Sequence, residues 1–138
     1  MNILALDYGE KFIGTALSIG GVAMPLETIK KKDKFTIKPA IKRIKDLIKE
    51  YEINLIILGL PLNMDDTPSK STAYVLEFKE RLARNFKKIE IILWEERLTT
   101  FCAEEILEER QIFGQNQKKF VDQMSALLIL QNYSGQNQ

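Results

Sequence analysis

Three continuous apolar runs stand out along the chain, at residues 2–7, 54–59 and 89–94. Their lengths are typical of strands rather than helices. A strand that is apolar throughout is buried on both of its faces, as in a parallel sheet covered by helices. We therefore expect these runs to be parallel strands of one sheet.

Two more strands are expected between the first and second runs. Residues 12–19 and 22–29 flank Gly20-Gly21, and a pair of glycines permits the tight turn of a hairpin. Because a two-residue hairpin joins antiparallel strands, it adds an antiparallel portion to the sheet.

Amphipathic stripes predict helices between the apolar runs. The first predicted helix carries Pro39 in its first turn, and its stripe consists of Ile37, Ile41, Ile44, Ile48 and Tyr51. The second is expected to start at Thr67-Pro68, with Thr67 as the cap, and its stripe consists of Val75, Phe78, Leu82 and Phe86.

Two further helices are expected after the third apolar run. Thr99 or Thr100 can cap one of them, with Glu104 and Glu105 in or near its first turn. The last helix is expected at about residues 118–133.

The order of these elements defines the expected fold. It is an α/β protein with a mixed five-stranded sheet and helices on both faces. Ligands of such sheets bind outside the carboxyl ends of the parallel strands. Asp7, Gly59-Pro61 and Glu95-Glu96 all fall at that edge.

Composition narrows the class of protein. A length of 138 residues fits one domain covering residues 1–138. No apolar run approaches the roughly 20 residues of a membrane span, and the N-terminus lacks the pattern of an export signal. The single Cys102 cannot form an internal disulfide. We therefore expect a cytoplasmic protein that does not contact membranes.

The net charge of +1 hides a strong asymmetry. Between Lys30 and Lys49, nine basic residues outweigh two acidic ones, whereas between Glu90 and Arg110 seven acidic residues outweigh two arginines. A basic band that attracts phosphates beside an acidic cluster that holds cations is typical of a nuclease. Two solvated helix faces would give the same pattern.

Four carboxylates are candidates for a metal site: Asp7, Glu95, Glu96 and Asp122. Burying an ionised carboxylate costs free energy unless a positive group lies close enough to compensate its charge. The chain has no histidine, so the positive group that we expect is a divalent metal ion with oxygen ligands, Mg²⁺ or Mn²⁺. Side chains alternate along a strand, so only one of Glu95 and Glu96 easily shares a site with Asp7. Taken singly, each acid is also explained as a turn, strand-end or helix-start residue.

Four sequence blocks lie in order across nearly the whole chain. They are Asp7-Tyr8-Gly9-x-Lys11-x-Ile13-Gly14, Gly59-Leu60-Pro61-Leu62-Asn63-Met64, Glu95-Glu96-Arg97-Leu98-Thr99-Thr100 and Val121-Asp122-Gln123…Ala126. Together they resemble the YqgF family, bacterial relatives of the Holliday junction resolvases within the ribonuclease H-like superfamily.

The resemblance implies a ribonuclease H-like fold and a cytoplasmic hydrolase, a nuclease that matures the 5′ end of pre-16S rRNA during ribosome biogenesis. The family's acidic positions fall on Asp7, Glu96 and Asp122. These would hold one or two metal ions, with Glu95 as an outer ligand, and metal-bound water would replace a protein base.

Polar and basic residues near the same edge are expected to contact the nucleic acid, and Gly9 leaves room for its backbone. They are Gly9, Lys11, Asn63, Arg97, Thr99, Lys118 and Lys119. The expected partners are pre-16S rRNA and ribosomal particles, bound by a monomer or a weak homodimer.

Three other functions stay open on the sequence alone. The same metal site could resolve branched DNA, which requires a dimer. The first loop also resembles that of nucleotide-binding proteins of the actin or sugar-kinase type, although those proteins close two such domains over the nucleotide. The third alternative is an RNA-binding ribosome assembly factor without catalysis.

Overall fold

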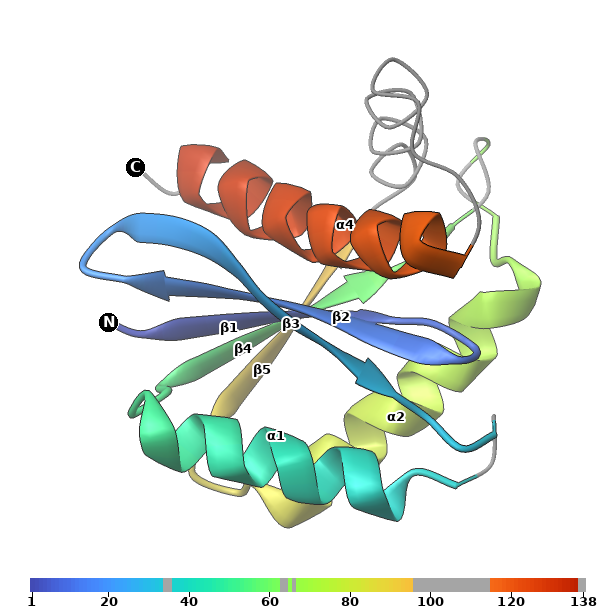
Figure 1. Cartoon of the computed structure of the whole chain (residues 1–138), viewed down its shortest axis with the longest axis horizontal. Coiled ribbons are helices and arrows are strands. Elements are labelled where there is room, and N and C mark those ends of the chain that lie inside the picture. The colour runs from blue at the N-terminus through green and yellow to red at the C-terminus, as the bar shows by residue number, and fades with distance from the viewer. Residues whose placement is uncertain (34–35, 63–64, 66, 96–114, 137–138) are drawn as a thin grey trace.

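The computed structural model describes residues 1–33, 36–62, 65, 67–95 and 115–136, and the side chains of 70, 115–123 and 135–136 lie outside this description. Its elements alternate as the sequence predicted (Figure 1). In chain order they are β1 (Ile3–Tyr8), β2 (Phe12–Ile19), β3 (Val22–Lys30), α1 (Lys38–Glu50), β4 (Leu55–Leu60), α2 (Lys70–Asn85), β5 (Glu90–Glu95) and α4 (Gln115–Gln136).

The strands form one mixed sheet of five strands in the order β3-β2-β1-β4-β5. β1, β4 and β5 pair in parallel, whereas β2 is antiparallel to both β1 and β3. Gly20 and Gly21 form the hairpin turn with φ angles of 60° and 81°, values that are costly for residues with a side chain. The predicted α/β architecture is confirmed.

Helices cover both faces of the sheet, as Figure 1 shows, with α1 and α2 on one face and α4 on the other. Strand alternation divides the core into two layers. Leu4 and Leu6 of β1 join the larger cluster, which packs with α1 and α2. Ile3 and Ala5 join the smaller cluster, which packs with α4.

Helix α2 begins at Lys70, so the predicted start at Thr67-Pro68 is wrong. Thr67 instead closes a short turn, in which its hydroxyl donates to Asp65 Oδ1 at 2.6 Å and its N–H donates to the same oxygen at 3.1 Å. Ser69 is the cap residue, and its N–H donates to Thr72 Oγ1 at 2.8 Å. Asx turns of this kind compete with helix capping for the same polar side chains.

Of the three other predicted helices, two lie within the described residues. Helix α1 carries Pro39 in its first turn, as expected. Helix α4 is longer at both ends than the predicted span of 118–133. The helix expected after Thr99 or Thr100 lies outside the described residues.

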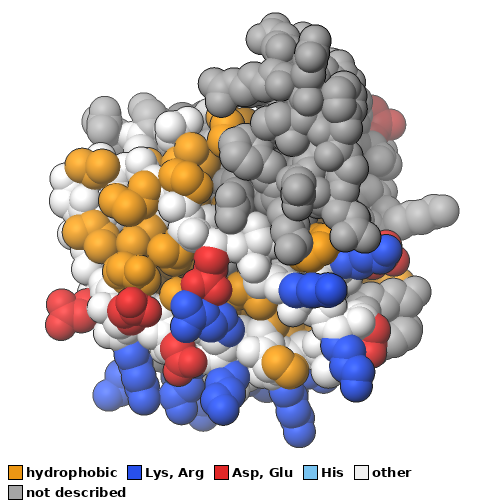
Figure 2. All heavy atoms as spheres, viewed as in Figure 1, with side chains coloured by type: hydrophobic (Ala, Val, Ile, Leu, Met, Phe, Trp, Pro, Cys, Tyr) orange, Lys and Arg blue, Asp and Glu red, His pale blue; other side chains and the backbone are white. Residues whose placement is uncertain are grey.

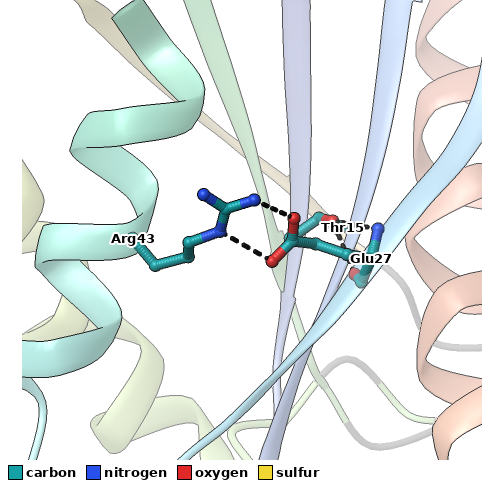
Figure 3. A network of polar contacts seen from close by, with 3 residues as sticks. All are labelled: Thr15, Glu27 and Arg43. Atoms are coloured by element: carbon teal, nitrogen blue, oxygen red, sulfur yellow. Dashed lines mark hydrogen bonds and ion pairs between the residues drawn. The ribbon is translucent and has the colours of Figure 1, made fainter. Parts of the chain in front are cut away.

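The edge strand β3 contains a bulge, because the pairing shifts between Gly14 and Ala16 of β2. At this point Thr15 replaces backbone pairing with its side chain (Figure 3). Its Oγ1 donates to the Glu27 carbonyl at 2.6 Å and accepts from the Glu27 N–H at 2.9 Å. The Glu27 carboxylate in turn accepts two hydrogen bonds from Arg43 of α1, at 2.9 Å and 2.6 Å. The bulge is thereby tied to α1.

Candidate active site at the end of strand β1

Asp7 lies at the carboxyl end of β1, on the face of the sheet that α4 covers. It follows Ile3 and Ala5 in the strand alternation, and both of these pack in the α4 layer. The residue is only 8% exposed. It pairs with Gly14 of β2, one residue beyond the last β1–β4 pair, Leu6 with Leu58. The sheet therefore presents a buried carboxylate where the parallel strands end.

The turn after Asp7 requires glycine at position 9. The Gly9 N–H donates to the carbonyl oxygen of Phe12 at 2.9 Å. A Cβ at this position would lie 2.6 Å from that oxygen, closer than such atoms approach. Lys11 is exposed at the turn, and its carbonyl accepts the Lys31 N–H at 2.8 Å. The turn that follows Asp7 is therefore tight at Gly9 and carries an exposed positive charge at Lys11.

Tyr8 points to the opposite face from Asp7 and meets a buried lysine. Its ring stacks on Phe78 at a centroid distance of 4.3 Å, and Lys31 Nζ lies 3.9 Å from the ring centroid. Lys31 is 4% exposed, and Nζ has no hydrogen-bond partner among the described residues. Burial lowers the pKa of Lys31, and it raises the pKa of Tyr8 with a further contribution from Glu77.

Lys31 was not predicted as an individual site residue, because the sequence shows it only as one of the nine basic residues between Lys30 and Lys49. A signal was present, since Lys31 follows the buried Ile29 by two positions and so continues the inward face of β3. The cation lies over an aromatic ring, an arrangement that partly offsets the loss of its hydration.

Helix α4 begins near the edge where β1 ends and runs back across the sheet (Figure 1). Its contact face contains Ser125, Ala126 and Ile129, each fully buried. Asp122 occupies the position one turn before Ser125 and Ala126. Lys118 and Lys119 occupy the first turns of the same helix. The side chains of these three predicted residues lie outside the described part.

Glu95 is the last residue of β5 and is paired with Leu60 of β4. It follows Leu93, which packs in the α1 and α2 layer, so strand alternation places it on the face opposite Asp7. Trp94, one residue earlier, packs in the α4 layer and meets the Tyr133 ring edge-on at 5.5 Å.

The remaining predicted site residues, Asn63, Glu96, Arg97 and Thr99, lie outside the described residues. Within the described part, no three His, Cys, Asp or Glu side chains come close enough to share a metal ion. None of the helices in that part combines the length and the apolar character needed to cross a membrane.

The fold is that of the ribonuclease H-like class. It is similar to the solved structure of T. thermophilus RuvC in complex with a Holliday junction substrate, with a TM-score of 0.57 and 15% identity over 99% of this chain and 96% of RuvC. A second structure of RuvC, from Thermus thermophilus, gives a TM-score of 0.55 over 99% of this chain and 97% of that one.

Sequence comparison then identifies the family. Residues 1–135 match the family model described as "RuvX: Holliday junction resolvase", and the chain belongs to this family. A relative from Thermoanaerobacter pseudethanolicus is 44% identical over 136 residues, covering 96% of this chain and 95% of its own. One from Lachnospira eligens is 40% identical over 135 residues, covering 96% of each. Both relatives carry the name "Putative pre-16S rRNA nuclease". The predicted family resemblance is confirmed.

Proposed function

We propose that this protein is a metal-dependent nuclease that hydrolyses a phosphodiester bond at the 5′ end of pre-16S rRNA, in the cytoplasm and within ribosomal particles. One observation carries the proposal. A buried carboxylate, Asp7, ends the central strand on the face where α4 begins, and Asp122 occupies an early turn of that helix. The names of the relatives supply the class of substrate.

The donor set suits a hard divalent cation. Asp7 offers carboxylate oxygens, and the chain contains no histidine, so Mg²⁺ or Mn²⁺ fits better than zinc. Asp7, Glu96 and Asp122 would hold the ion, which when bound activates water and neutralises charge on the scissile phosphate. Glu95, on the opposite face of β5, would contribute only as an outer ligand.

The chain's own residues would position the nucleic acid. Gly9 keeps the turn beside Asp7 tight, because a Cβ there would meet the Phe12 carbonyl, so that its backbone can lie against the nucleic acid, and the exposed Lys11 supplies a positive charge there. Further contacts are proposed for polar and basic residues that the sequence places around this edge: Asn63, Arg97, Thr99, Lys118 and Lys119.

The test compares the wild type with Asp7→Asn on a pre-16S transcript that carries its 5′ leader, in the presence of Mg²⁺. We expect the variant to cleave at least about a hundredfold more slowly, because one charged ligand becomes neutral. Asp46→Asn, which neutralises an exposed acid of α1, is the matched control and should cleave normally. Undiminished cleavage by Asp7→Asn would contradict the proposal that Asp7 belongs to the active site.

Resolution of branched DNA is the second candidate, because the family model carries the description of a Holliday junction resolvase. Symmetric cutting of a four-way junction requires two active sites, and hence a dimer. Cleavage of a four-way junction in preference to the transcript, by a protein that sediments as a dimer, would favour this candidate over rRNA processing.

A further inference from the structure

A groove with a volume of about 730 Å³ runs between α1 and α2, on the face of the sheet opposite α4. Five basic side chains line it: Lys38, Lys42, Lys45, Arg81 and Arg84. They come from two helices that are far apart in the sequence. Figure 2 shows Lys and Arg side chains gathered over α1, along the lower part of the view.

The positive charge of the groove is not compensated by acidic residues in its lining. No acidic side chain lines it, and none of its five cations forms an ion pair with another described residue. Arg43, by contrast, also belongs to α1 but points to β3 and is paired with Glu27. Lysines concentrated without partners are costly to hold together, so their placement favours an anionic ligand.

The lining of the groove suits the binding of charged phosphates rather than of bases. Its apolar lining consists of Ile41 and Phe86, and Phe86 is only 8% exposed, so no open ring is available for a base to stack on. Asn85, the one amide in the lining, already donates to the Arg81 carbonyl at 2.8 Å. A ligand held here is therefore recognised through its phosphates.

The α1 end of the groove lies at the same edge of the sheet as the end of β1, although on the opposite face. Helix α1 begins at the end of the sheet where β1 ends and runs away from it (Figure 1). From Lys38 to Lys45 it rises by about 10 Å, so the lysines form a ladder that leads from this edge along the outer face. A nucleic acid longer than the cleaved segment would pass over this ladder.

We infer that the groove between α1 and α2 binds the phosphate backbone of RNA flanking the cleaved bond, independently of its sequence. The inference rests on the proposed function for the identity of the RNA. The groove itself is a binding surface separate from the carboxylates, because it lies on the opposite face of the sheet.

The test measures RNA binding without cleavage, by fluorescence anisotropy in EDTA with a labelled, structured pre-16S leader RNA. The groove variant is Lys42→Ala/Arg84→Ala, in which both residues are exposed. The control variant is Lys49→Ala/Lys88→Ala, which removes the same charge from exposed positions outside the groove. Equal urea midpoints establish that both variants are folded.

We expect the groove variant to bind about tenfold more weakly and its log–log salt slope to fall by about 1.5, between about 0.05 and 0.2 M salt. The control variant should change less than about twofold. Equal affinities of the two variants would overturn the inference. If the groove variant bound a four-way DNA junction more weakly but bound the RNA as the wild type does, the inference would also be overturned, in favour of a DNA-binding groove.

Cleavage of a short oligonucleotide separates this inference from the proposed function. The groove variant should cleave it as the wild type does, since so short a substrate does not reach the groove. If the wild type cleaves neither RNA, the proposed function fails, while the anisotropy result still decides whether the groove binds RNA.

Discussion

Lys31 Nζ lies 3.9 Å from the centroid of the Tyr8 ring, on the strand end that also carries Asp7. The ammonium is buried and has no hydrogen-bond partner among the described residues. The Tyr8 ring and the carboxylates of Glu10 and Asp33 favour the ammonium, but burial outweighs them, so its charged form is disfavoured in the folded protein.

We predict that Lys31→Met changes the pH dependence of stability. The pKa of Lys31 is lower in the folded protein than its usual value of 10.5, so the unfolded chain binds more protons between the folded and unfolded pKa values. The free energy of unfolding of the wild type should therefore rise with pH across that window, relative to Lys31→Met. Urea denaturation at about pH 7 and about pH 10 measures the difference. Tyr8 is present in both proteins, so its own titration largely cancels. A constant difference between the two proteins would contradict the prediction.

Thr15→Val should destabilise the protein by about 2 kcal/mol, because it removes both hydrogen bonds to the Glu27 backbone at the bulge. Thr15→Ser retains the hydroxyl and loses only a methyl group, so it should cost about 1 kcal/mol or less. Urea unfolding curves give both values. If serine and valine were equally destabilising, the hydroxyl would have no special role at the bulge.

Gly9→Ala should impair both stability and cleavage. Its Cβ would lie 2.6 Å from the Phe12 carbonyl, so the turn must shift, at a cost of about 1–3 kcal/mol, and Asp7 shifts with it. Gly20→Ala is the matched control: it adds a Cβ at a φ of 60° but in open space, far from Asp7. It should cost about 1 kcal/mol and leave cleavage unchanged. Normal cleavage by Gly9→Ala would show that the turn does not position Asp7.

Mg²⁺ should raise the melting temperature of the wild type and leave that of Asp7→Asn nearly unchanged. A ligand that binds only the folded state stabilises it, by about 2.7 kcal/mol at a concentration of one hundred times its Kd. Calorimetry with and without EDTA measures the shift, with Ca²⁺ as a comparison ion. An equal shift in both proteins would place the ion elsewhere.

The sequence predicted the sheet well because its strands are continuous apolar runs between clear glycine signals. Leu55–Leu60, for example, is apolar throughout and can only be buried on both faces. The start of α2 could not be predicted, because Thr67 and Ser69 are equally good caps; in the structure Thr67 is bonded to Asp65, whereas Ser69 is bonded to Thr72 of the helix.

The site was predictable in part. Strand alternation indicated that only one of Glu95 and Glu96 shares a face with Asp7, and the family resemblance favoured Glu96; the structure has Glu95 on the face opposite Asp7. The basic groove was not predictable, because the sequence shows the lysines of α1 but not that Arg81 and Arg84 pack opposite them. That relationship depends on how two helices cross over a shared sheet.

The bulge in β3 opposite Thr15 also determines which face of the sheet the residues after it occupy, including Ile29 and Lys31. Before the bulge, Leu26 is the β3 residue that packs in the α1 and α2 layer, whereas after it Ile29 does so, three positions later instead of two or four. The extra residue reverses the phase of the strand. Deleting the one extra residue, for example Glu27, would therefore restore regular alternation and keep Ile29 and Lys31 on their present face, whereas deleting two residues there would turn both to the other face. The face on which Lys31 meets Tyr8 is therefore set by the single extra residue of the bulge.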